Sequence, residues 1–90
     1  MVALFVIMAY DVNVARVNRV LKIGRRYLSW VQNSLLEGEL TKAQLARLKA
    51  DVKKVIDEEE DSIVFYLLRR RQYMERELLG QDKGGQSLVL

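Results

Sequence analysis

The chain has 90 residues, half of them hydrophobic and 30% charged, a size and balance typical of one small folded domain. It contains no Cys and no His. This excludes disulfides, Cys nucleophiles, His general bases, Cys/His zinc sites, haem and iron–sulfur clusters, and leaves carboxylates, hydroxyls, amines or a hard metal ion for any catalysis. The net charge of +3 is mildly basic, and because so small a domain buries a limited share of its surface, we expect a dimer.

An uninterrupted apolar run, ALFVIMA at 3–9, predicts a buried first strand. The run is too short to span a bilayer, and with the lack of Cys it favours a soluble, cytoplasmic protein. Tyr10, Asp11 and Val12 follow, which places a carboxylate just past the end of the strand, where α/β folds tend to build their sites. Asp11 either binds a divalent cation or caps the next helix, and the residues alone favour the cap.

A first helix is predicted from about Asn13 to Arg26, because apolar residues recur there at helical spacing. Gly24 lies near its end, where a left-handed residue is common, so the helix could end a turn early. Four basic residues share the side away from the apolar stripe: Arg16, Arg19, Lys22 and Arg26. No acidic residue occurs between Val12 and Leu36 to balance them, so this side is either a solvated helix surface or a surface that binds nucleic-acid phosphates.

A second strand is predicted at 27–36, with a bend or bulge because its alternation is imperfect. Its aromatic residues, Tyr27 and Trp30, could stack on bases but are more typical of a core. The segment 37–39, Glu-Gly-Glu, is interpreted as the turn that ends this strand. Thr41 and Gln44 then have the spacing of a capping box at the start of a second helix. The apolar stripe of that helix consists of Leu45, Leu48, Val52, Val55 and Ile56.

The acidic run 57–61 is predicted to be a solvated connection that leads into a third strand at 62–68. Three arginines at 69–71 then either extend the basic surface or end an exposed strand. Residues 73–79 fit a half-exposed strand or a short helix, and residues 80–86 fit a flexible linker. The apolar tail 87–90 is predicted to add as a strand to a sheet, in this chain or in a partner subunit.

This order of elements predicts an α+β fold, the ferredoxin-like βαββαβ sandwich with an extra C-terminal strand. We divide the chain into a ferredoxin-like domain at 1–79 and a C-terminal linker and strand at 80–90. The fold hosts many functions and therefore cannot name one.

Four segments together resemble one family. They are the apolar strand ending in Tyr10-Asp11-Val12 before an Arg-bearing helix; Val31-Gln32-Asn33-Ser34 leading into Glu37-Gly38-Glu39-Leu40; the acidic run 57–61 before Ser62; and the tail 80–90 with its Gly, charged linker and apolar end. In this order and spacing they are similar to the CRISPR-associated Cas-two family, the small partner protein of the spacer-acquisition machinery. Two departures concern loop detail. Leu36 stands where the family often has an aromatic residue, and the acidic run lacks the usual Pro.

The resemblance implies a homodimer with the tail strand exchanged between subunits. It implies that Asp11 of each subunit faces its mate and that the pair holds one Mg²⁺ or Mn²⁺ ion, which favours the metal role of Asp11 over the cap. It also implies a metal-dependent endonuclease acting on RNA or DNA. Asp11 is then the catalytic residue, with Tyr10 and Ser34 as its neighbours, and a nucleic-acid surface is formed by Arg16, Arg19, Lys22 and Arg26.

Our leading hypothesis from the sequence is a CRISPR adaptation protein that binds duplex DNA as a dimer and bridges subunits of the CRISPR integrase. The nuclease activity through paired Asp11 would accompany that role. The alternative is a stand-alone metal-dependent endoribonuclease of the ferredoxin-like toxin kind, acting on single-stranded RNA.

Overall fold

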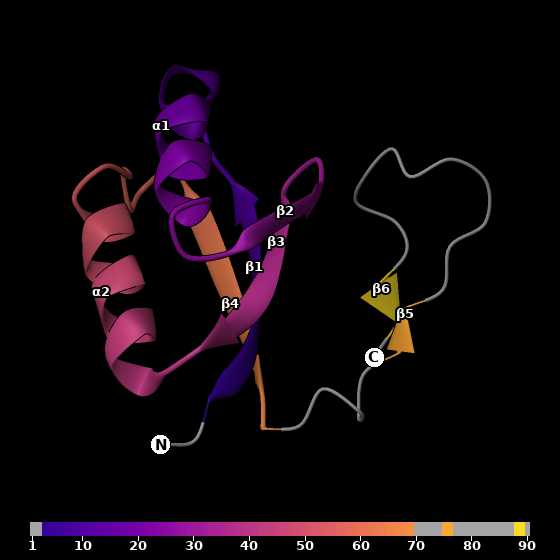
Figure 1. Cartoon of the computed structure of the whole chain (residues 1–90). Helices are drawn as coiled ribbons and strands as arrows, with labels where there is room; N and C mark the ends of the chain where they lie inside the picture. The colour runs from indigo at the N-terminus through magenta and orange to yellow at the C-terminus, as the bar shows by residue number, and fades with distance from the viewer. Residues whose placement is uncertain (1–2, 70–74, 77–87, 90) are drawn as a thin grey trace.

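The computed structural model describes residues 3–69, 75–76 and 88–89. Along the chain lie β1 (Leu4–Asp11), α1 (Val14–Gly24), β2 (Ser29–Gln32), β3 (Leu35–Leu40), α2 (Lys42–Lys53), β4 (Ser62–Leu68), β5 (Glu75–Arg76) and β6 (Leu88–Val89). The first four strands form an antiparallel sheet in the order β2-β3-β1-β4, and both helices cover one of its faces (Figure 1). The predicted α+β, ferredoxin-like order is confirmed.

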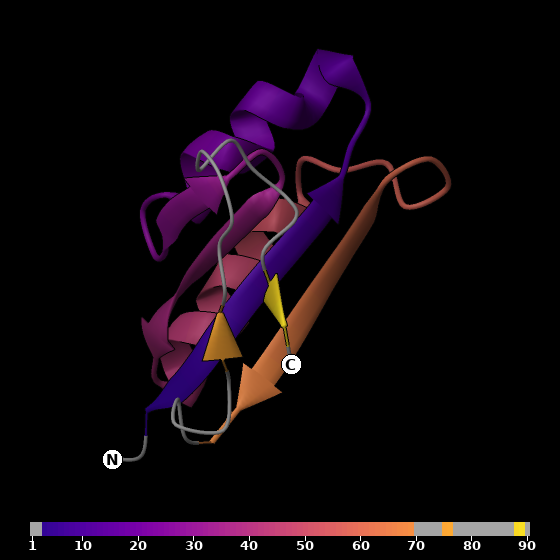
Figure 2. The ribbon, with the colours of Figure 1, turned by 90° about the vertical axis from the view of Figure 1, so that its right-hand side faces the viewer.

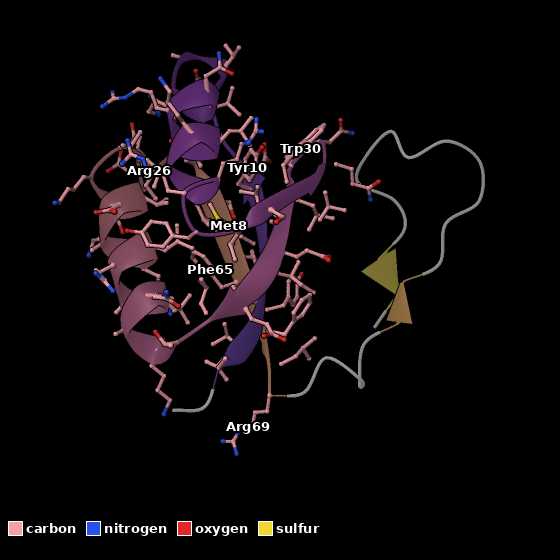
Figure 3. All side chains as sticks on the ribbon, in the orientation of Figure 1. Met8, Tyr10, Arg26, Trp30, Phe65 and Arg69 are labelled. Atoms are coloured by element: carbon pink, nitrogen blue, oxygen red, sulfur yellow. The ribbon has the colours of Figure 1, made fainter. Side chains whose placement is uncertain are left out.

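The central strand β1 divides its side chains between the two faces of the sheet, because successive residues of a strand point in opposite directions. Val6, Met8 and Tyr10 belong to the core cluster beneath the helices, which we call the helix face. Figure 3 shows Met8 and Phe65 between the sheet and the helices. The alternate residues, among them Ile7 and Asp11, therefore lie on the other face, which we call the opposite face. The helix-face cluster consists of Val6, Met8, Tyr10, Val20, Leu28, Leu36, Leu40, Leu45, Leu48 and Val52.

The predicted second strand at 27–36 is wrong, because the structure divides it into a hairpin. β2 and β3 are joined at Asn33 and Ser34, and Asn33 has a positive φ of 32°, a conformation that Asn tolerates better than most residues. A register irregularity between Trp30 and Gln32 confirms the predicted bulge. Trp30 is 50% exposed, so the expectation that it belongs to the core is also wrong.

The predicted turn at 37–39 is wrong as well, because these residues lie within β3 and pair with β1. Gly38 suggested a turn, but it fills a different role in the strand. A Cβ at Gly38 would lie 3.2 Å from Cδ2 of Leu28, so the small residue permits close packing of the loop that follows α1.

The early end of α1 is confirmed at Gly24, but not for the predicted reason. The next residue, Arg25, is right-handed with φ −69° and ψ −14°, so the helix does not end in a left-handed residue. A Cβ on Gly24 would instead collide with Cδ1 of Leu36 and lie 3.6 Å from Sδ of Met8. The last turn of α1 therefore sits directly on the sheet, and Gly allows that approach without displacing Leu36.

Replacing Gly24 with Val should lower the free energy of unfolding by about 2 kcal/mol, because the fully buried Leu36 side chain would have to shift within the core. Urea unfolding measures this loss. Ala15→Val is the matched control at an exposed position of α1 and should cost about 0.5 kcal/mol of helix propensity. Equal losses in the two variants would contradict the close packing at Gly24.

The second helix follows its sequence signals closely. Thr41 Oγ1 accepts from Gln44 N, and the Gln44 side chain accepts from Thr41 N, which confirms the capping box. Leu45, Leu48 and Val52 are buried, while Val55 and Ile56 lie beyond the helix and pack against the core as partly buried residues. Neither α1 nor α2, the helices of the described residues, has the length and hydropathy that a membrane span requires.

The C-terminal part of the chain contributes a second, two-stranded sheet of β5 and β6. Figure 2 shows it in front of the main sheet, on the side away from α2. The tail therefore does form a strand, as predicted, and in the single chain its partner is β5. Its exchange between subunits stays a prediction. β4 has the predicted bounds, whereas the predicted linker at 80–86, Arg70 and Arg71 fall outside the described residues.

Candidate functional site

Asp11 is the last residue of β1, and its side chain is exposed on the opposite face of the sheet. Its cross-strand neighbour on β4 is Ser62, and on the other side the β2–β3 turn approaches β1, because Tyr10 N donates to Ser34 O at 3.0 Å. Within residues 3–69 no side chain or backbone N–H pairs with the Asp11 carboxylate. This carboxylate therefore has both oxygens available for a ligand from outside the chain.

The interpretation of Asp11 as a helix cap is wrong. The cap of α1 is Asn13, whose Oδ1 accepts from Ala15 N at 2.9 Å. Asp11 still belongs to the β1–β4 ladder, two residues before the cap, so its side chain does not reach the first turn of the helix. The structural role that competed with metal binding at Asp11 is thus filled by another residue.

The predicted neighbours of the site, Tyr10 and Ser34, support the end of β1 rather than face Asp11. Tyr10 points into the core on the helix face, and its hydroxyl donates to Asn33 O at 3.0 Å. Burial raises the pKa of the Tyr10 hydroxyl, so it remains protonated near neutral pH. Ser34 meets β1 through its backbone carbonyl. Together these two bonds tie the β2–β3 turn to the strand that carries Asp11.

Asp61, which the sequence pattern did not single out, is buried at the junction of β1, α1 and β4. Its carboxylate accepts from Arg16 Nε at 2.7 Å and Nη2 at 3.1 Å, from Asn13 N at 2.9 Å and from Asp57 N at 2.8 Å. We call this arrangement the Asp61 clamp. The predicted solvated connection is therefore wrong at Asp61, although Glu58, Glu59 and Glu60 are exposed.

The Asp61 clamp also changes the interpretation of Arg16. The bond from Arg16, with the two backbone N–H groups, holds the pKa of the Asp61 carboxyl far below its usual range, and Asp61 in turn raises the pKa of Arg16. Arg16 Nη2 makes a further contact with Glu60 at 3.3 Å. The expectation that no acid balances the basic side of α1 is wrong for Arg16, which adds no free cation to that surface.

The remaining basic residues in α1 and just after it are exposed, and they divide into two groups. An open hollow along the helix is lined by Asn18, Arg19, Leu21, Lys22 and Arg25. Arg26 instead lies on the side towards α2 (Figure 3). Arg69 follows the end of β4 that pairs with the start of β1, so it lies at the far end of the sheet from Asp11 and does not extend the α1 surface.

The described residues contain no cluster of three or more acidic side chains that could hold a metal ion. Mg²⁺ nevertheless fits the chemistry of Asp11, because it accepts oxygen ligands, retains several waters and often uses only one or two carboxylates together with substrate phosphates. Within residues 3–69, Asp61 at this end of β1 is engaged by Arg16 and two backbone N–H groups, which leaves Asp11 as the carboxylate available for a metal ion. Any complete site would need a second copy of the chain or the substrate.

Comparison with known proteins identifies the family. The family model described as CRISPR associated protein Cas2 matches residues 4–76. The chain belongs to the CRISPR-associated Cas2 family. The predicted resemblance is therefore confirmed, and the matched segment includes Asp11, α1 and the Asp61 clamp.

Several relatives of this Cas2 chain share most of its length. A protein of Dictyoglomus turgidum named CRISPR-associated endoribonuclease Cas2 is 48% identical over 87 residues, covering 97% of this chain and 100% of the relative. CRISPR-associated endoribonuclease Cas2 2 of Archaeoglobus fulgidus is 53% identical over 83 residues, covering 92% of this chain and 90% of its own.

Solved Cas2 structures have the same fold. A crystal structure of Cas2 superimposes with a TM-score of 0.82 at 41% identity, over 98% of this chain and 99% of the other. The Streptococcus pyogenes Cas2 crystal structure at pH 6.5 gives a TM-score of 0.74 at 37% identity, over 84% of this chain and 99% of the other.

Proposed function

We propose that this Cas2 chain is a metal-dependent endoribonuclease whose active site contains Asp11 from each of two copies of the chain. The observation that carries the proposal is the exposed Asp11 carboxylate at the end of β1, which has no partner within residues 3–69. Relatives that are 48% and 53% identical over more than nine-tenths of this chain are named endoribonucleases. Their names favour the endoribonuclease alternative over our leading hypothesis of a DNA-holding adaptation protein.

A second copy of the chain could supply the second carboxylate for the metal ion. Asp11 lies on the opposite face of the sheet, and so do Val64 and Tyr66 of β4, which are each 42% exposed. Apolar surface of this kind is stabilised when another surface covers it. A two-fold pairing of these faces would bury Val64 and Tyr66 and bring two Asp11 side chains towards one axis. We therefore propose a homodimer with one active site that the two chains share.

The chemistry follows from the residues available. A Mg²⁺ or Mn²⁺ ion, when bound, would polarise a phosphate and lower the pKa of a water molecule, which replaces the general base that a chain without His lacks. The task of Asp11 is to supply the ligand oxygens. Tyr10 and the β2–β3 turn hold the backbone at the end of the strand that carries Asp11.

The experiment that tests this function is cleavage of end-labelled single-stranded RNA by the purified chain in Mg²⁺, Mn²⁺ or EDTA, with duplex DNA in parallel. We expect RNA cleavage that requires a divalent ion, with a specific activity that falls when the protein is diluted below its dimerisation constant. RNA cleavage that persists in EDTA, or activity that is independent of dimerisation, would contradict the proposal.

The exposed cations of α1 favour a second function, the binding of duplex DNA in spacer acquisition beside an integrase subunit. Within the described residues, ion pairs are found at Arg16 but not at Arg19, Lys22 or Arg25. Phosphate contacts of this kind position a nucleic acid without reading its sequence. Co-elution of the dimer with its integrase subunit and a DNA duplex would support this role, and it is compatible with RNA cleavage.

The double variant Arg19→Ala with Lys22→Ala should weaken binding to all duplexes alike. Each lost phosphate contact should reduce the slope of log affinity against log salt by about 0.9, because fewer counterions are released. Fluorescence anisotropy between 50 and 200 mM salt, a range over which such contacts act strongly, measures the slope. Lys42→Ala is the control, since Lys42 is an exposed lysine at the start of α2. A loss that depends on the DNA sequence would rule out simple phosphate binding.

A further inference from the structure

Trp30 is the only Trp of the chain, and it is half exposed on the edge strand β2. It lies across from Leu36 on β3, which lies across from Met8 on β1, so the three residues form one row of the sheet. Leu36 and Met8 are completely buried beneath the helices. Trp30 continues the same row towards the edge, where the helices no longer cover it.

Hydrogen bonding holds the Trp30 ring in place without covering its faces. The indole Nε1–H donates to Asn33 O at 2.9 Å, and the same carbonyl accepts from the Tyr10 hydroxyl at 3.0 Å. The polar atom of the ring is therefore satisfied, and one edge of the ring is fixed by the turn. What the ring presents to solvent is apolar and aromatic surface, which attracts another flat ring.

Exposed cations occur near the end of α1, which packs on the cross-strand neighbour of Trp30. The last turn of α1 sits on Leu36 through Gly24, and Leu36 is the direct neighbour of Trp30 in the sheet. Cross-strand neighbours of this kind have Cβ atoms about 5 Å apart. Lys22 and Arg25, on either side of Gly24 in the chain, are exposed and line the hollow along α1. An exposed aromatic ring on the same face of the sheet as exposed cations is a combination that suits unpaired nucleic acid, because bases stack on the ring while the cations contact the phosphates.

Trp30 and Asp11 are also connected through the fold. Both Trp30 and Tyr10 donate to Asn33, and Tyr10 precedes Asp11 in β1. Both side chains thus belong to the same end of the sheet, but Asp11 lies on the opposite face and Trp30 on the helix face. A base on Trp30 and a phosphate at Asp11 would therefore belong to different nucleotides of one bound strand.

We propose that Trp30 is a stacking platform that holds an unpaired base of the RNA substrate at the same end of the sheet as Asp11. The proposal rests on the endoribonuclease function proposed above. It makes Trp30 a specificity residue that selects single-stranded over duplex RNA, because bases within a duplex are already stacked and paired. Lys22 and Arg25 would hold the phosphates of the same strand.

Intrinsic fluorescence tests the proposal in the unmodified protein, because all Trp emission comes from this one position. The probe is a short single-stranded RNA titrated in EDTA, with binding followed independently by anisotropy of an end label. We expect saturable quenching of Trp30 emission and protection from acrylamide. An abasic oligomer of the same length, which keeps the phosphates, should bind without quenching.

Two variants separate stacking from general damage. Trp30→Leu should bind the single-stranded RNA about 10-fold more weakly and leave binding of the abasic oligomer unchanged. Trp30→Phe keeps an aromatic ring and should recover most of the lost affinity. Unchanged emission in a saturated complex, or equal RNA affinity of wild type and Trp30→Leu, would overturn the proposal. Emission that changes with protein concentration alone would also overturn it, because Trp30 would then be covered by a second copy.

The outcome for Trp30 can be distinguished from the outcome for the proposed function. Cleavage in Mg²⁺ with normal kcat and raised KM in Trp30→Leu would support both proposals. Cleavage with no change in KM for Trp30→Leu would leave the nuclease function intact and remove the stacking role. Quenching without any metal-dependent cleavage would keep Trp30 as an RNA contact and remove the nuclease function.

Discussion

Asp11→Asn is expected to reduce metal-dependent RNA cleavage by at least about 100-fold. Removing a group that merely supports a metal ligand lowers metal affinity or activity by about 10- to 100-fold. Asp11 would be a ligand itself, and it is the only acidic residue of β1. Asn keeps the size of the side chain and removes its charge. Because the Asp11 side chain is exposed, with no partner within residues 3–69, the variant should fold and melt like the wild type.

A matched control separates the role of Asp11 from general loss of negative charge. Glu58→Gln makes the same carboxylate-to-amide change at an exposed residue of the acidic run 57–61, and it should leave cleavage unchanged. Both variants should be checked as dimers by light scattering. Residual activity in a dimeric Asp11→Asn protein equal to that of the wild type would remove Asp11 from the mechanism.

Asp61→Asn is expected to have the largest effect on stability among single substitutions of a carboxylate. Asp61 receives four hydrogen bonds, and its replacement leaves Arg16 without the carboxylate that both Nε and Nη2 contact. Losing one partner of an enclosed ion pair is strongly destabilising. We expect the Tm to fall by roughly 10 °C in a thermal melt.

The exposed member of the same network provides the comparison for Asp61. The Glu60 side chain is 54% exposed and contacts Arg16 Nη2 at 3.3 Å, so Glu60→Gln should lower the Tm by no more than about 2 °C. Similar shifts for Glu60→Gln and Asp61→Asn would show that the Asp61 clamp is no more than a surface ion pair.

The Asp61 clamp also predicts how stability changes in acid. The pKa of Asp61 is lower in the folded chain than its ordinary value of 3.8. The unfolded chain therefore binds the proton first, and the contribution of Asp61 is fully present above about pH 5 and declines as the pH falls below about 4. The Tm of the wild type should fall more steeply in that window than the Tm of Asp61→Asn. Parallel acid profiles would contradict the depressed pKa.

The sequence predicts well those helices and strands whose signals come from neighbouring residues. The apolar run of β1, the bounds of β4 and the capping box of α2 depend on neighbouring residues, and all three occur as expected. The β2–β3 hairpin was missed because its turn uses Asn33-Ser34 rather than a Gly pair, while Gly38 is inside a strand for packing reasons. A bulge near Trp30 also disturbed the alternation that would have separated the two strands.

The candidate site was only partly predictable for a related reason. Position in the sequence places Asp11 at the end of a strand, but whether it caps a helix depends on where the helix begins, and that is decided at Asn13. Asp61 and Arg16 are 45 positions apart, so their pairing is set by tertiary structure alone. Arg16 and Arg19 look alike in the helical pattern, yet only Arg16 reaches the Asp61 clamp.

The stoichiometry of bound Mn²⁺ tests the central claim, that two copies of Asp11 share one metal ion. Titration of the dimer, followed by the electron paramagnetic resonance of free Mn²⁺, gives the number of ions per chain. We predict one ion for every two chains, and loss of this site in dimeric Asp11→Asn. One ion per chain, or a site that survives Asp11→Asn, would contradict the shared site.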